Sequence, residues 1–127
     1  MKQHSPGFLA IVEESKQHIQ TISPQRLQDM LQHNPLMKLI DVREGDEWVL
    51  GHLSQAIHLS KGIIERDIEK NIPDIKTPIV VYCSGGFRSA LVAYNLHKMG
   101  YSEVYSLDKG MQGWIECGLT IENELKS

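Results

Sequence analysis

The stretch Pro78-Ile79-Val80-Val81-Tyr82-Cys83-Ser84-Gly85-Gly86-Phe87-Arg88-Ser89 carries the pattern that decides the fold of this 127-residue chain. Its apolar, largely β-branched run over 79–82 predicts a short strand that is buried on both faces. Apolar residues then recur at helical spacing over 89–99, and a glycine follows as a helix stop. A strand, a tight turn and a helix place Cys83 at the carboxyl end of the strand, where α/β sheets bind ligands.

The residues of this turn are suited to hold a reactive cysteine. Cys83 precedes the expected helix N-terminus, a position that favours the thiolate. Gly85 and Gly86 allow backbone angles at which successive N–H groups point at one anion. Arg88 adds a planar cation that pairs well with oxyanions. We interpret the turn as a nucleophilic cysteine in an anion-binding loop, in preference to a buried strand-end cysteine beside an ordinary glycine turn.

Further motifs flank this stretch in a fixed order, and together they resemble the single-domain rhodaneses, a family of sulfurtransferases. The resemblance covers nearly the whole chain, from Ile19 to Ile121. Besides the stretch above, the landmarks are Leu39-Ile40-Asp41-Val42-Arg43-Glu44, Glu47-Trp48, Gly51-His52-Leu53, Ala56-Ile57-His58-Leu59, Gly100-Tyr101, Val104-Tyr105, and Gly110 with Trp114. The resemblance implies an α/β rhodanese-like domain with a central parallel five-stranded sheet and helices on both faces.

The chain is expected to have two parts. Residues 1–18 form an N-terminal helical extension, which starts at Ser5 and Pro6 and packs on the domain rather than forming a dimer contact. Residues 19–127 form the rhodanese-like domain. Its expected strands are 19–22, 38–41, 55–59, 79–82 and 103–107. Its expected helices begin at Ser23-Pro24, Glu44, Ser60 and Ser89, and a last helix is anchored in the core by Trp114 and Ile115.

The resemblance also implies roles for individual residues. Cys83 is the implied nucleophile. Substrate binding is implied for the rest of the turn: Ser84, Gly85, Gly86, Phe87, Arg88 and Ser89. Asp41 and Arg43 are implied to support the site through hydrogen bonds and ion pairs, with a solvated surface pair as the alternative for Arg43. His52 is expected to fix a turn by hydrogen bonds rather than to act as a base.

Other residues depart from the family pattern or lie outside it. Gln55 and Lys109 stand where the family usually has glycine. We expect ordinary backbone angles at Gln55, and a cost on the order of 1 kcal/mol at Lys109 if its φ is positive. Lys61 is considered as an additional cation near the turn. Cys117 is expected to pack in the core rather than to act as a resolving thiol.

The activity implied by the resemblance is that of a thiosulfate sulfurtransferase. Cys83 would take a sulfane sulfur from thiosulfate or a related donor and pass it, as a persulfide, to a small thiol or a protein acceptor. From Cys83 to Arg88 the turn has six residues, as in family members that act on sulfur, whereas the related phosphatases have one more. A sulfur carrier loaded by a partner protein is the alternative; a phosphatase or a non-catalytic interaction module is less favoured.

The composition limits which kinds of partner the protein is expected to bind. The net charge of −3 gives no electrostatic case for nucleic acid or anionic membrane, and no segment approaches the ~20 apolar residues of a membrane span. The six histidines show no metal-ligand spacing, and no metal or organic cofactor is implied. Because the two cysteines cannot form a disulfide framework and Cys83 must be reduced to react, a cytoplasmic location is expected.

Overall fold

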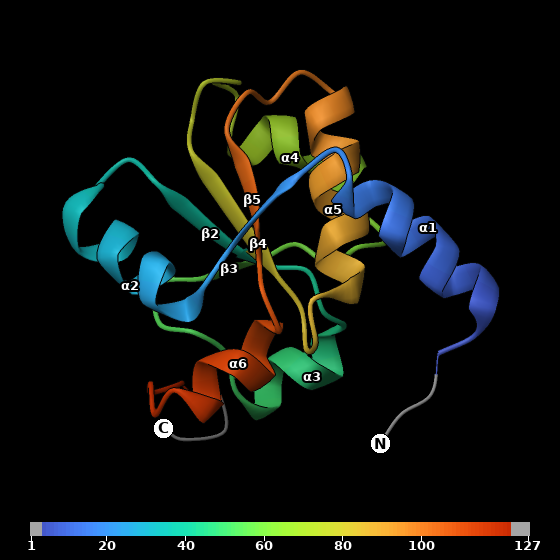
Figure 1. The fold of residues 1–127 in the computed structure, drawn as a ribbon. Helices are drawn as coiled ribbons and strands as arrows, with labels where there is room; N and C mark the ends of the chain where they lie inside the picture. Colours follow the sequence, from blue (N-terminus) through green and yellow to red (C-terminus); the bar gives the residue numbers. More distant parts are fainter. Residues whose placement is uncertain (1–3, 123–127) are drawn as a thin grey trace.

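The computed structural model describes residues 4–122, which fold around a five-stranded sheet (Figure 1). The strand order is β1-β5-β4-β2-β3, and every neighbouring pair is parallel. The strands are β1 (Gln20–Ile22), β2 (Lys38–Asp41), β3 (Ile57–His58), β4 (Ile79–Tyr82) and β5 (Val104–Leu107). The helices are α1 (Pro6–Lys16), α2 (Pro24–His33), α3 (Gly45–Leu50), α4 (Ile64–Asn71), α5 (Phe87–Lys98) and α6 (Gly110–Glu116). The predicted α/β fold is confirmed.

The central strand β4 connects two separate hydrophobic cores. Its side chains alternate, so that Ile79 and Val81 join the core beneath α4 and α5, whereas Val80 and Tyr82 join the core beneath α2 and α6. All four residues are fully buried. Helices therefore cover both faces of the sheet, as predicted, and the carboxyl end of β4 leads directly into the turn that carries Cys83.

Helix α1 lies against α5 and is the outermost helix on that side of the sheet (Figure 1). Ser5 caps it as predicted, because its side-chain oxygen accepts a hydrogen bond of 3.3 Å from the Phe8 N–H. Val12 is buried at the contact, whereas Leu9 is 42% exposed. The predicted packing on the domain is thus observed. Residues 1–3 of the predicted extension and residues 123–127 of the predicted domain lie outside the described structure.

Two expectations about the segment before α4 are wrong. Gln55 has φ 71°, so a glutamine occupies the left-handed conformation that the family's usual glycine adopts without strain. The strand β3 is also shorter than the expected 55–59, since it spans only Ile57–His58. Ser60 is not the helix cap: its carbonyl oxygen accepts hydrogen bonds from the N–H groups of Ile63 and Ile64, both 3.0 Å, and α4 begins one turn later than expected.

Candidate active site

The turn between β4 and α5 presents two backbone N–H groups to the sulfur of Cys83. Gly86, with φ 95°, is the N-cap of α5 and donates to Sγ at 3.2 Å. The N–H of Ser89, in the first turn of the helix, lies 3.4 Å from the same atom. A thiolate at this position would be stabilised by both donors and by the helix dipole. The turn therefore has N–H donors placed to stabilise an anion on the Cys83 sulfur.

A pair of buried hydroxyl groups extends this arrangement into the core. Ser89 Oγ lies 3.5 Å from Cys83 Sγ and 2.8 Å from Ser106 Oγ, and both serines are almost inaccessible to solvent. When Cys83 is a thiolate, Ser89 can donate its hydroxyl hydrogen to the sulfur and accept one from Ser106. Ser106 was not predicted from the sequence, because only the register of β5 beside β4, with Ser106 opposite Val81, brings it to the site.

The first residues of α6 hold the other side of the turn. The Met111 and Gln112 N–H groups donate to the carbonyl oxygens of Cys83 and Ser84 at 2.8 and 3.0 Å. Gly110 makes this approach possible, because a Cβ there would clash with the Cys83 carbonyl oxygen. The preceding Lys109 has φ 60°, which is the strained conformation considered from the sequence.

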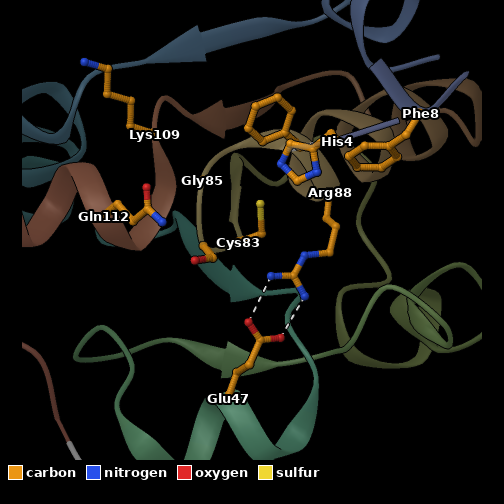
Figure 2. A pocket seen from close by; sticks show the side chains of 10 residues that line it. His4, Phe8, Glu47, Cys83, Gly85, Arg88, Lys109 and Gln112 are labelled. Atoms are coloured by element: carbon orange, nitrogen blue, oxygen red, sulfur yellow. Dashed lines mark hydrogen bonds and ion pairs between the residues drawn. The ribbon is translucent and has the colours of Figure 1, made fainter. Parts of the chain in front are cut away.

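Cys83 opens into a cavity of about 780 Å³, although its own exposure is only 1%. In Figure 2 Arg88 lies to one side of Cys83, Lys109 and Gln112 lie to the other, and Glu47 lies below. Of the predicted substrate-binding residues, Ser84, Gly85, Phe87 and Arg88 line this cavity. Gly86 and Ser89 are buried and contribute their N–H groups to the sulfur.

Arg88 forms a two-pronged ion pair with Glu47, which the sequence analysis had not assigned to the site (Figure 2). The distances from Nη1 to Oε1 and from Nη2 to Oε2 are 2.7 and 3.0 Å. The hydrogen bonds that Glu47 accepts from Arg88 lower its pKa to about 2, although partial burial opposes this shift. The same hydrogen bonds raise the pKa of Arg88. Glu47 is held in α3 by a capping box with Glu44. The charge of Arg88 is therefore largely compensated.

Replacing Glu47 with glutamine is expected to destabilise the protein at neutral pH but not in strong acid. The pKa of Glu47 is lowered from 4.5 in the unfolded chain to about 2 in the folded one, so the stabilisation is complete above pH 4.5 and lost as the pH falls toward 2. Denaturant unfolding across this range measures it. Asp46→Asn, also in the first turn of α3, is the control for the helix dipole and should show a smaller effect. A Glu47→Gln difference that persists undiminished at the acid end would contradict the assignment.

Asp41 and Arg43 form a buried ion pair, so the alternative of a solvated surface pair is wrong. Arg43 Nε lies 3.1 Å from both carboxylate oxygens of Asp41, and Nη2 lies 2.8 Å from Oδ2. The same Nη2 donates to the Gly51 carbonyl oxygen at 2.6 Å. Burial opposes the charge of Arg43, but hydrogen bonds to Asp41 and its negative charge raise the pKa of the guanidinium. The pair connects the end of β2 to the end of α3.

His52 is buried next to this ion pair. Its ring stacks on Trp48 with a centroid distance of 3.6 Å, and Nδ1 lies 3.0 Å from the Leu53 carbonyl oxygen. Within residues 4–122, the cavity lining includes neither His52 nor the Asp41–Arg43 pair. All three residues are thus placed to shape the segments around the turn rather than to touch a ligand.

Two further residues lie elsewhere than expected. Lys61 borders a separate, smaller hollow beside α1 and α5, and Lys109 is the lysine that lines the main cavity. Cys117 is exposed at the end of α6, where Gln25 Nε2 lies 3.3 Å from its sulfur, so the expected core placement is wrong. The inward face of α6 carries Met111 and Trp114 instead, and Ile115 is half exposed.

The described residues hold neither a cluster of metal ligands nor a helix that could span a membrane. Among residues 4–122, no three His, Cys, Asp or Glu side chains gather in a way that could hold a metal ion. None of the described helices has the length and apolar character needed to cross a membrane.

Comparison with known families identifies the class of protein. Residues 23–117 match the model of the rhodanese-like domain, and the chain belongs to this family. Thiosulfate sulfurtransferase GlpE of Coxiella burnetii is 38% identical over 76 residues, which are 60% of this chain and 69% of that protein.

Other relatives carry different names. The tRNA uridine(34) hydroxylase of Chlamydia trachomatis is 33% identical over 101 residues, 71% of this chain, but this chain covers only 29% of the hydroxylase. Among solved structures, the polysulfide-sulfur transferase homodimer of Wolinella succinogenes is 33% identical, with a TM-score of 0.80 over 92% of this chain and 88% of that one.

Proposed function

We propose that the protein is a sulfurtransferase that carries a sulfane sulfur as a persulfide on Cys83. The observation that carries this proposal is the position of Cys83 Sγ. This sulfur accepts hydrogen bonds from the N–H groups of Gly86 and Ser89, and Cys83 lines a cavity. The six-residue turn and the family membership support it, as do relatives named thiosulfate sulfurtransferase and polysulfide-sulfur transferase. Because the reaction needs a reduced cysteine, a cytoplasmic location is part of the proposal.

The reaction is a double displacement. The Cys83 thiolate attacks the outer sulfur of thiosulfate, the S–S bond breaks, and sulfite leaves with the bonding electron pair. The persulfide that remains on Cys83 is then attacked by a thiolate or by cyanide, which takes the outer sulfur and restores the Cys83 thiolate. Arg88, oriented by Glu47, lines the cavity beside the position of the anionic donor.

A sulfur carrier loaded by a partner protein is the second candidate. The observation that favours it is the ion pair between Arg88 and Glu47, which leaves little uncompensated positive charge to attract a small dianion. A high KM for thiosulfate together with efficient transfer from or to a protein would distinguish the carrier. A hydroxylase activity is not proposed, because the similarity to that relative covers less than a third of its length.

The intact mass of the purified protein tests the proposal directly. Incubation with thiosulfate should add the mass of one sulfur atom, and subsequent cyanide should remove it. The chain offers a matched control, because the exposed Cys117 is the second cysteine. The adduct should be absent in Cys83→Ser and present in Cys117→Ser. The reverse pattern would place the persulfide on Cys117 and overturn the assignment. Hydrolysis of an aryl phosphate that is lost in Cys83→Ser would replace sulfur transfer by phosphatase chemistry.

A further inference from the structure

The N-terminal segment supplies part of the cavity that contains Cys83. His4 and Phe8 line it together with Phe87 of the catalytic turn. The ring centroid of His4 lies 5.1 Å from that of Phe8 and 4.5 Å from that of Phe87. The three rings therefore form a continuous surface, here called the aromatic wall. Figure 2 shows His4 and Phe8 on the same side of Cys83 as Arg88, opposite Lys109 and Gln112.

The aromatic wall differs from an ordinary packing contact. Helix α1 is held on α5 by other residues, such as Val12, which is 2% exposed. His4, Phe8 and Phe87 are only partly buried, although aromatic rings are costly to leave in contact with water. Partly exposed rings beside a few polar groups are the usual lining of a site for an organic molecule.

The size and charge of the cavity also favour an organic ligand. At about 780 Å³ it falls within the roughly 300–1,000 Å³ of sites that enclose drug-sized ligands, whereas thiosulfate is only slightly larger than sulfate. Arg88, the cation of the turn, is paired with Glu47. A small dianion would therefore leave most of the aromatic wall in water and find limited compensating charge.

We propose that the aromatic wall binds the apolar body of an organic sulfane-sulfur donor, a thiosulfonate or persulfide in which a ring or branched alkyl group is attached to the leaving sulfur. This inference rests on the proposed sulfurtransferase function. The Cys83 thiolate attacks the outer sulfur of the donor, and the S–S bond breaks. The leaving sulfinate or thiolate keeps the bonding electron pair, and its apolar body remains against Phe8 and Phe87 until release.

Two donors that differ only in their body test the proposal. With cyanide as acceptor, kcat/KM for benzenethiosulfonate should exceed that for methanethiosulfonate by about tenfold in the full chain, which corresponds to one favourable aromatic contact. Phe8→Ala should bring this ratio close to one. Phe8→Leu, which keeps an apolar side chain in α1, should give an intermediate ratio. Leu9→Ala removes an exposed apolar side chain from the same helix and is the control.

Binding measurements separate this inference from the proposed function. Benzenesulfonate and methanesulfonate carry no transferable sulfur, so calorimetry reports their binding without turnover. Stronger binding of benzenesulfonate that is lost in Phe8→Ala and kept in Leu9→Ala supports the aromatic wall, even if no donor is turned over and sulfur transfer fails. A ratio near one in the unmodified protein, in turnover or in binding, would overturn it. Equal losses in Phe8→Ala and Leu9→Ala would do the same.

Discussion

Replacing Cys83 with serine is expected to lower thiosulfate:cyanide turnover by roughly 10⁴-fold or more, as removal of other covalent nucleophiles does. A serine hydroxyl is a weak nucleophile at neutral pH and has no adjacent general base in the turn. The fold should survive, because the serine hydroxyl can still accept hydrogen bonds from the N–H groups of Gly86 and Ser89. We expect the free energy of unfolding to change by no more than about 1 kcal/mol.

Thiocyanate formation and denaturant unfolding measure the two quantities separately. Cys117→Ser, at the exposed cysteine, should retain both turnover and stability. Undiminished turnover in Cys83→Ser would refute the mechanism. Loss of the fold in that variant would instead show that the thiol is needed for packing, and the activity loss would then say nothing about chemistry.

Replacing Gly110 with alanine is expected to damage both the fold and the site. A Cβ at this position meets the Cys83 carbonyl oxygen at a clashing distance, and the residue has φ 51°. The backbone cost alone is about 1–2 kcal/mol, and the clash must also displace the turn that carries Cys83. We expect the free energy of unfolding to fall by at least about 2 kcal/mol and turnover to fall with it, because the hydrogen bond from Met111 to Cys83 is broken.

Gly118→Ala separates the two causes. Gly118 also has a left-handed backbone, with φ 78°, but a Cβ there would have no neighbour within 4 Å. Its replacement should cost only the backbone term of about 1–2 kcal/mol and leave turnover intact. Similar effects of both alanine variants, measured by denaturant unfolding and turnover, would mean that the approach of Gly110 to the turn is not critical.

Local patterns predicted much of the molecule because they report on burial and on chain geometry directly. The bounds of β2 and β4 were predicted to the residue; for β4 the signal is its apolar, largely β-branched run, which parallel sheets bury on both faces. The caps Ser5 and Ser23 were also found, because capping depends on neighbouring residues alone. Errors arose where a side chain's surroundings are set by another element, as for Cys117, which is the C-cap of α6 and not part of its inward face.

The sequence by itself determined the position of Cys83 between a strand and a helix, because this follows from residues adjacent in the chain. It also determined the parallel α/β fold, through the resemblance of its ordered motifs to a known family. The tertiary structure alone decided which distant side chains reach that cysteine. Glu47 pairs with Arg88 across 41 positions, Ser106 contacts Ser89 through the register of two strands, and Phe8 arrives on a helix outside the sheet. Such contacts depend on the packing of whole elements, which no local pattern encodes.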